Sequence, residues 1–427
     1  MPPIIIAFYG LLLYGVFGFF SLYIDFANYL KFLAIGVVLY AYFKAPKNYR
    51  FDSTSVGLKL FVVLTIFIVL RGSIIGFTPV FSWHRQYDLY QIVRYFFVFE
   101  YSALSFVLML FVLVPFNIKE LRYYRSITYI SFGLTLFNIF LFKDNLFDST
   151  MLGRTGIFIG EEEVTIRNLI SLCFIGFGFI LLFCYSIKSF RRNSWDYLPF
   201  IILILYALSQ IAGGGRGGTI TALLYLAFAL YFFYNSSRGK AGASIIVKLL
   251  IVVGAIYAVY YLFVKTEFFS FFLSRMFEGG EVGGDLVESS REYFTKSLYE
   301  DLNRNPLGWV FGYGVNGAFE VPGNGLRSSI EWGYWYLILK GGVPYLLVYV
   351  YVLLKSAYLG FFRSNNGFSK AMAVLCLMTA YSLIPFGLPG VSLQFLLIWH
   401  YLRLINTASV RAMSDTEIAR LINSNYR

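Results

Sequence analysis

The chain of 427 residues is 58% hydrophobic and 21% aromatic, only 14% of its residues are charged, and its mean hydropathy is +0.68. A soluble domain of this length needs far more polar surface, so the composition predicts a membrane protein with many spans. The formal charge of +12 does not indicate nucleic-acid binding, because the basic residues gather in short breaks between apolar runs. The cysteines lie in apolar runs without metal-ligand spacing, which argues against a zinc site or a disulfide framework: they are Cys173, Cys184 and Cys376.

Apolar stretches of sufficient length predict about twelve transmembrane helices in an all-α fold. The first stretch lacks the basic region and the cleavage pattern of a signal peptide, so we expect it to be retained as a span. The predicted spans are residues 4–21, 28–43, 57–75, 92–115, 127–142, 165–187, 197–213, 218–234, 245–264, 331–354, 371–386 and 389–405.

The distribution of charge predicts that both termini are cytoplasmic. With this orientation the inner loops hold more than half of the 35 basic residues and few acids, as the positive-inside rule requires. We therefore expect a single transmembrane domain over 1–405, with a cytoplasmic tail over 406–427. In the tail, Ile418, Leu421 and Ile422 fall on one face of a short amphipathic helix, which is expected to lie on the inner membrane surface or on the bundle.

The same orientation places three polar segments on the outer side of the membrane, 71–91, 143–164 and a long periplasmic loop over 265–330 that carries short helices. These segments hold arginines that the topology rule disfavours there. Such arginines either pair with acids and lipid headgroups or bind an anionic substrate. Outer aromatic residues either form the interfacial belt or stack on sugars. The candidate substrate contacts are His84, Arg85, Arg154, Arg275, Tyr313, Arg327 and Trp335.

Arg216 lies in the sequence QIAGGGRGGTITALL, where glycines flank a single arginine between two apolar runs. Glycines let the backbone approach a ligand closely and offer its amides to an anion. The guanidinium group is permanently charged and matches the geometry of phosphate oxygens. A glycine-rich stretch is also an ordinary tight connection, but such a turn does not require the arginine.

Arg291 begins the motif REYFTKSLYEDLNRNP, whose apolar residues recur at helical spacing. This pattern predicts a short amphipathic helix that ends at Asn305–Pro306 and is followed by a glycine-rich turn. Glu331 begins the next apolar run among tryptophans and tyrosines. Partial desolvation there would raise the pKa of a carboxylate toward the range of a general base; alternatively, Glu331 balances a nearby Arg327 or Lys340.

Together these motifs resemble the bacterial O-antigen polymerase and O-antigen ligase superfamily. The resemblance covers roughly residues 209–354 and is carried by GGGRGGTITALLY, SSREYFTKSLYEDLNRNPLGWVFGYGVNG and EWGYWYLILKGGVPYLLVYVYVLL, in this order. Members of the superfamily have an arginine near the start of a middle span and a late periplasmic loop with an arginine-led helix. A polar catalytic residue stands about ten positions before a glycine pair, and Glu331 occupies that position here.

The resemblance implies a glycosyltransferase of the bacterial inner membrane that polymerises undecaprenyl-pyrophosphate-linked repeat units of a surface polysaccharide. Arg216 and Arg291 would bind the pyrophosphate, and Glu331 would be the general base. No cofactor or metal is expected, because the acidic run 161–163 lacks the spacing of a metal cage. The expected partners are the lipid-linked glycans and membrane lipids, with a chain-length regulator and a flippase as further candidates.

Two alternatives remain open at this stage. A ligase would transfer the finished glycan to lipid A core or to protein. Ligases usually have a histidine followed by asparagine at the catalytic position, whereas the histidines here are His84 and His400, and this difference favours a polymerase. A flippase or transporter would show internal repeats and charges near the bilayer midplane. No convincing repeat is seen, but Lys31 and Arg94 keep that alternative open.

Overall fold

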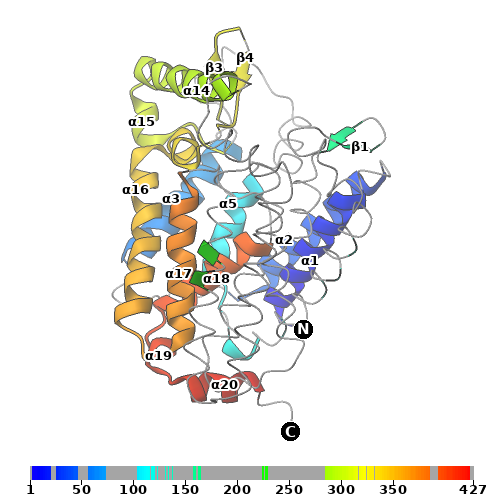
Figure 1. The fold of residues 1–427 in the computed structure, drawn as a ribbon, viewed down its shortest axis with the longest axis vertical. Coiled ribbons are helices and arrows are strands. Elements are labelled where there is room, and N and C mark those ends of the chain that lie inside the picture. The colour runs from blue at the N-terminus through cyan, green and yellow to red at the C-terminus, as the bar shows by residue number, and fades with distance from the viewer. Residues whose placement is uncertain are drawn as a thin grey trace, which may run out of the picture.

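The fold was determined as a computed structural model and is mostly helical (Figure 1). It describes single residues at 123, 130, 133, 137, 224, 225, 227 and 228, and the ranges 2–20, 26–46, 56–73, 103–115, 117–120, 157–159, 162–164, 284–315, 317–323, 325–330, 332–384 and 393–423.

The helices of the first part of the chain are α1 (Pro3–Phe20), α2 (Phe26–Lys44), α3 (Val56–Ser73) and α5 (Ala103–Met109), followed by the 3-10 turns η1 (Leu110–Leu113) and η2 (Ile118–Glu120). Those of the later part are α14 (Gly284–Arg304), α15 (Leu307–Phe311), α16 (Gly333–Phe362), α17 (Gly367–Ser382), α18 (Leu393–Asn406), α19 (Ala408–Ala412) and α20 (Asp415–Asn423).

Among the residues that the structure describes, two short antiparallel hairpins accompany the helices, and the sequence does not predict them. In one, β1 (Ile157–Ile159) pairs with β2 (Glu162–Val164) within the segment expected to be an outer loop. In the other, β3 (Phe319–Val321) pairs with β4 (Gly325–Arg327), with Glu320 opposite Leu326. The described part of the chain is mostly helical, which is consistent with the predicted all-α class, and the two hairpins are small additions to it.

The core of the bundle is rich in aromatic side chains from α3, α16 and α18. Phe61 stacks on Trp399 with ring centres 4.9 Å apart, and on Tyr345 at 5.9 Å. Tyr345 also shares a hydrogen bond of 3.1 Å with Thr65 across the same interface. Offset and edge contacts of this kind add stabilisation beyond burial alone, so α3, α16 and α18 are held together as one packed unit.

Several predicted spans coincide with helices of the structure. The spans predicted at 4–21, 28–43 and 57–75 correspond to α1, α2 and α3, and those at 331–354, 371–386 and 389–405 correspond to α16, α17 and α18. Residues 103–113 of the span predicted at 92–115 form α5 and η1. The spans predicted at 165–187, 197–213 and 245–264 lie outside the described residues, and so do all but a few positions of 127–142 and 218–234.

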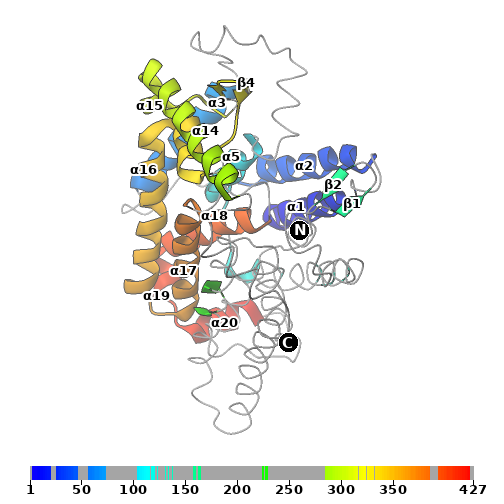
Figure 2. The ribbon, with the colours of Figure 1, turned by 45° about the horizontal axis from the view of Figure 1, so that its top comes forward.

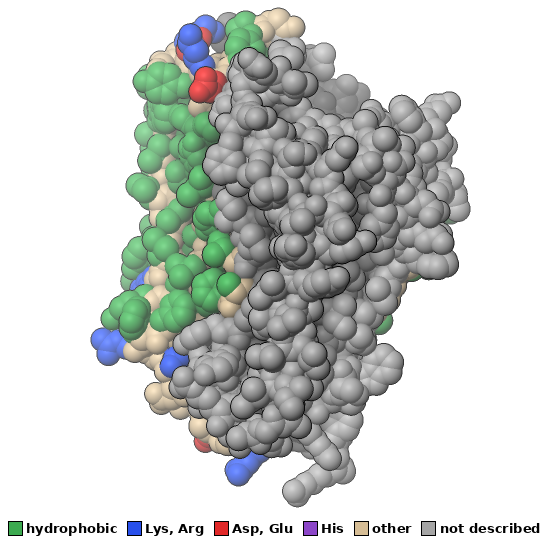
Figure 3. All heavy atoms as spheres, in the orientation of Figure 1, with side chains coloured by type: hydrophobic (Ala, Val, Ile, Leu, Met, Phe, Trp, Pro, Cys, Tyr) green, Lys and Arg blue, Asp and Glu red, His purple; other side chains and the backbone are tan. Residues whose placement is uncertain are grey.

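Helix α16 has 30 residues and, within the described part of the chain, is the one helix both long enough and apolar enough to cross a membrane. The outward face of α16 is apolar, with exposed Leu347, Tyr351, Leu354, Tyr358 and Phe362 at helical spacing. Figure 3 shows hydrophobic side chains running along this side of the molecule, with basic side chains near both ends. A surface of this kind is what a lipid-facing helix presents.

The tail is packed onto the bundle by hydrogen bonds around the start of α17. The Asn366 side chain accepts from the Ser369 N–H at 2.7 Å, which caps α17, and donates to the carbonyls of Val410 and Met413 at 2.9 Å each. The amphipathic helix predicted in the tail is present as α20, and its Ile418 is fully buried. Its apolar face is therefore covered by the protein itself.

Candidate active site at the loop end of α16

The end of the molecule beyond the start of α16 is formed by α14, α15 and the β3–β4 hairpin (Figure 1, Figure 2), and is called the loop end below. Helix α14 buries Leu298 and Leu302 completely and exposes charged residues on its other side. The predicted amphipathic helix around Arg291 is therefore confirmed, although it begins as early as Gly284. This helix carries the backbone of Arg291 to the loop end.

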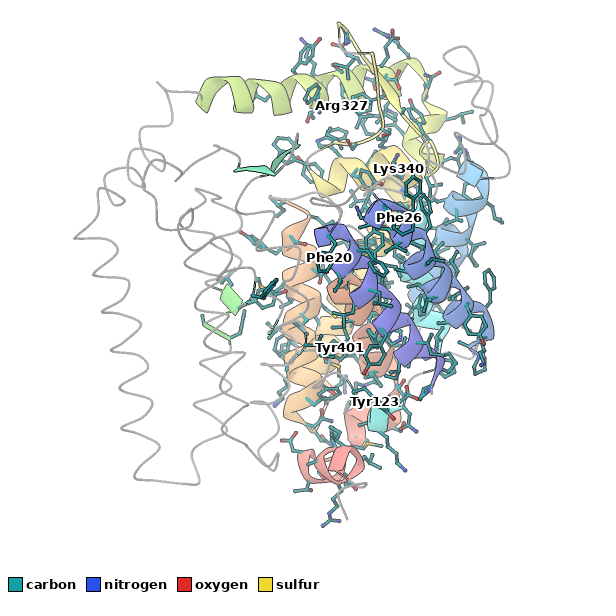
Figure 4. All side chains as sticks on the ribbon, turned by 90° about the vertical axis from the view of Figure 1, so that its right-hand side faces the viewer. Phe20, Phe26, Tyr123, Arg327, Lys340 and Tyr401 are labelled. Carbon is teal, nitrogen blue, oxygen red and sulfur yellow. The ribbon has the colours of Figure 1, made fainter. Side chains whose placement is uncertain are left out.

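The β3–β4 hairpin is held on α14 by two polar contacts. The guanidinium carbon of Arg327 lies 3.7 Å from the centre of the Phe294 ring, in a cation–π contact. The Tyr293 hydroxyl donates a hydrogen bond to the Pro322 carbonyl. A cation–π contact of this exposure contributes about 0.5–1 kcal/mol. In this arrangement Arg327, a predicted substrate contact, faces α14 (Figure 4).

The chain reverses direction after α14 through Asn305–Pro306 and the glycine-rich turn, as predicted. Pro306 precedes the first residue of the short helix α15, where a missing N–H costs nothing. Gly312 ends α15 with φ 59° and ψ −163°, a conformation that is essentially restricted to glycine. A Cβ at Gly312 would also lie 2.4 Å from the backbone nitrogen of Gly341. Only glycine therefore fits where the turn meets α16.

Helix α16 is kinked at Gly342, whose φ of 76° and ψ of 177° lie outside the helical region. Pro344 has no N–H, so the Lys340 carbonyl cannot accept its usual helical hydrogen bond. The Lys340 carbonyl accepts instead from the Gly314 N–H at 2.9 Å, and that of Leu339 from the Tyr313 N–H at 2.7 Å. The glycine-rich turn thus replaces helical hydrogen bonds that the kink removes, and this fixes the turn on α16.

Two basic side chains secure the same junction. Lys340 is 1% exposed, and its Nζ donates to the Gly317 carbonyl at 2.7 Å and lies 5.3 Å from the centre of the Tyr336 ring. Arg71, in the last turn of α3, donates from Nη1 to the Phe311 carbonyl at 3.0 Å. Figure 4 shows Lys340 and Arg327 at the same end of the molecule. A buried ammonium group is costly unless it is hydrogen-bonded, so the Lys340 bond ties the turn firmly to the helix.

The Tyr313 side chain is 5% exposed and lies close to Asp301 of α14. Burial, and next the negative charge of Asp301, raise the pKa of the Tyr313 hydroxyl well above its ordinary value. The hydroxyl therefore stays protonated at any physiological pH and is a hydrogen-bond donor. The ring of Tyr313 is packed inside the loop end. The contact of Tyr313 with substrate stays a prediction.

Partly exposed aromatic rings line the loop end next to the start of α16. Trp335, another predicted substrate contact, lies 6.0 Å from Trp309 and 5.9 Å from Tyr334, and Tyr334 stacks on Trp332 at 5.7 Å between ring centres. Such rings suit both sugar stacking and a membrane interface. Both interpretations from the sequence therefore stay open for Trp335.

The structure brings some of the predicted site residues together, and others lie beyond its description. Arg327, Tyr313, Trp335 and the backbone of Arg291 meet at the loop end. Glu331 comes directly before Trp332, the residue that caps α16, but Glu331 itself and the side chain of Arg291 are not described. Five further predicted residues lie outside the described ranges: His84, Arg85, Arg154, Arg216 and Arg275.

Sequence reasoning missed the residues that join the loop to the helix. The sequence predicts Lys340 only as a possible partner of Glu331, and it indicates Arg71 only as an arginine of the outer segment 71–91 and Gly342 only as part of a glycine pair. A signal was present in KGGVP, because a lysine, two glycines and a proline inside an apolar run predict a helix break. The groups that would occupy that break could not be identified from spacing.

Neither a protein-family description, nor a curated protein, nor a solved structure matches this chain. Within the described ranges, His, Cys, Asp and Glu side chains do not gather in groups of three that could hold a metal ion. The chemistry of the loop end is therefore argued from its own residues.

Proposed function

We propose that the protein is a membrane glycosyltransferase that polymerises undecaprenyl-pyrophosphate-linked oligosaccharide repeat units of a surface polysaccharide. One observation carries the proposal. The motif that contains Arg291 and the motif that begins with Glu331 are separated in sequence, yet the turn of the first is hydrogen-bonded into the kink of the second. A general base and an anion-binding arginine can act on one substrate only if the segments that carry them are held at a fixed distance. The hydrogen bonds between the glycine-rich turn and α16 support such an arrangement.

The roles of the cations follow from what each is bonded to. Arg71 and Lys340 already donate to loop carbonyls, and Arg327 lies on Phe294. These three hold the loop end together. The resemblance of their motifs to the superfamily assigns the leaving pyrophosphate to Arg216 and Arg291, whose guanidinium groups would neutralise the charge that develops as the bond to the sugar breaks.

The proposed reaction needs one base and one anion site. Glu331 would remove the proton from an acceptor hydroxyl, and the resulting oxygen would attack C1 of the donor sugar. The bond from C1 to the phosphate oxygen would break, and undecaprenyl pyrophosphate would leave with the bonding electrons. The proton on Glu331 would then pass to water. A positioned base contributes about 10²–10⁴-fold to such a step, so its loss should nearly abolish polymerisation.

The test compares glycan length in a deletion strain that carries the wild type, Glu331→Gln or Arg291→Lys, with the amount of protein in the membrane measured in each case. Lysine keeps the charge of arginine but loses its forked geometry. Glu300→Gln and Arg304→Lys are matched controls, because both residues are exposed on the same helix as Arg291. We expect long chains with the wild type and the controls, and single repeat units with Glu331→Gln.

The strain without the protein separates the alternatives. Single repeat units attached to their final acceptor indicate a polymerase. Full-length glycan left on the lipid carrier would instead show that the protein is a ligase. Repeat units retained on the cytoplasmic side would point to a flippase, and normal chains with Glu331→Gln would remove the proposed base.

A further inference from the structure

The exposed surface of the loop end changes abruptly from charged to apolar at Asn305–Pro306. Before this point, α14 exposes charged side chains at helical spacing together with two tyrosines, whose hydroxyl groups are polar: Glu292, Tyr293, Lys296, Tyr299, Glu300 and Arg304. After it, α15 exposes Leu307 by 66%, Val310 by 47% and Phe311 by 45%. Large apolar residues are not left in water next to each other without a reason, so the two helices face different surroundings.

The apolar surface of α15 continues onto the apolar face of the bundle. The ring of Phe311 lies 6.2 Å from that of Phe67, which is exposed on α3 together with Val63 and Leu70. On the other side, α15 packs against α16, whose outward residues begin with Leu347. Figure 3 shows hydrophobic side chains along this whole side of the molecule. One apolar surface therefore extends from α15 down to the far end of α16.

The length of α16 sets the level of α15 relative to a bilayer. The roughly 20 residues from Gly342 to Phe362 rise about 30 Å, which matches the hydrocarbon thickness of a membrane. Arg363 follows directly and is exposed, as expected for a residue at the inner boundary. The outer boundary then falls near Gly342. At this residue a Cβ would lie 2.4 Å from the carbonyl oxygen of Val310 in α15. Helix α15 thus lies at the level of the interface.

The aromatic rings beside α15 fit the same level. Trp309 packs between Tyr299 and Trp335, at 5.7 and 6.0 Å between ring centres, and its indole N–H donates to the Asn303 side chain at 3.2 Å. A tryptophan with an apolar body and a hydrogen-bonded polar edge is typical of the headgroup region. The indole thus points its polar edge toward charged α14.

We infer that α15 is an interfacial segment, and that Leu307, Val310 and Phe311 insert among the lipid chains of the leaflet on the loop-end side. The segment 265–330, predicted as a water-facing loop, would then touch the bilayer through these residues. The inference does not rest on the proposed polymerase activity. It holds equally for a ligase or a transporter, and its test does not measure glycan.

The test uses the full-length protein, with its cysteines replaced by alanine, in vesicles of phosphatidylglycerol and phosphatidylcholine. A nitroxide label is placed at Val310→Cys and, independently, at Leu307→Cys. The accessibility of the label to oxygen, which concentrates in lipid, is compared with that to a water-soluble nickel chelate. The matched controls are Glu300→Cys on charged α14 and Leu347→Cys on the outward face of α16.

We expect the labels at Val310 and Leu307 to favour oxygen over the chelate, as the label at Leu347 does, and the label at Glu300 to favour the chelate. A label at Val310 that behaves like the one at Glu300 would overturn the inference, because α15 would then face water. Low accessibility to both reagents would overturn it as well, because protein would cover the segment. The labelled sites are exposed, so the substitutions should leave folding intact.

Discussion

Replacing Gly312 by alanine should weaken the junction between the glycine-rich turn and α16. The added Cβ would lie 2.4 Å from the Gly341 nitrogen and 2.4 Å from the carbonyl carbon of Lys340. Both are backbone atoms, which cannot swing aside as a side chain can. The backbone of Gly312 is also in a region that alanine rarely adopts.

The size of the effect is the sum of these two terms. The unfavourable backbone conformation costs about 1–3 kcal/mol, and forcing a methyl group into a filled space costs about 1–3 kcal/mol more. Unfolding entropy of about 2.1 cal/mol/K per residue gives about 0.9 kcal/mol/K for the 427 residues. The melting temperature should therefore fall by about 2–7 °C for a loss of about 2–6 kcal/mol.

The assay is thermal unfolding of the purified protein in detergent, followed for three variants. Gly323→Ala is the first control, because Gly323 also has a positive φ, 75°, but has open space around its Cβ position. It should show the backbone cost alone, about 1–2 kcal/mol. Gly36→Ala, in helix α2 with open space and no positive φ, should be neutral or stabilising by about 1 kcal/mol. Equal losses for Gly312→Ala and Gly323→Ala would refute the close approach of turn and helix.

Three further predictions concern polar groups. Asn366→Ala should cost about 2–4 kcal/mol through a lost cap and lost hydrogen bonds to the tail, and should speed tail proteolysis. Asn366→Asp keeps the cap acceptor but sets a buried carboxylate against the tail carbonyls, so it should cost at least as much as alanine. Lys340→Met removes the bond to the Gly317 carbonyl and should increase hydrogen exchange over 305–330, so unchanged exchange would contradict its role. Hydrogen bonds from Ser414 lower the pKa of Glu417, so this carboxylate stabilises α20 above its ordinary pKa and the effect is lost as the pH falls through the lowered value. The protection factors of the α20 amides, which are exchange rates relative to the intrinsic rate at the same pH, should therefore fall in acid for the wild type, and Glu417→Gln should show the lower protection already at pH 7.

Most helix positions could be predicted because apolar runs are separated by charged breaks. The run at 4–21 appears as α1, which covers 3–20, and that at 57–75 as α3. The predicted span ends at Leu354, directly before Lys355, whereas α16 continues to Phe362. In the structure Lys355 stays helical, and its Nζ lies 5.5 Å from the centre of the Tyr351 ring. Hydropathy locates where polarity changes, but a lysine with a long apolar stem does not end a helix.

The candidate site was predictable only in part, for a physical reason. The helix of Arg291 could be predicted because its signal is local and periodic. The junction could not, because the carbonyls of Leu339 and Lys340 are satisfied by residues distant in sequence, and such pairing depends on the tertiary fold. The β3–β4 hairpin was missed although PGNG marks a turn in FEVPGNGLR, because strands of three residues are too short to show a clear alternation of apolar and polar residues.

The hydrogen bonds from the glycine-rich turn to the carbonyls of Leu339 and Lys340 have a consequence for how the protein is made. A membrane helix normally supplies all of its own backbone partners before it enters lipid. Here the donors, Tyr313 and Gly314, precede the acceptors along the chain, so the ribosome delivers them first. In the proposed orientation they have already crossed the membrane when Leu339 and Lys340 leave the translocon. With the predicted orientation, biogenesis would follow a fixed order, in which the turn is exported before the helix that it completes.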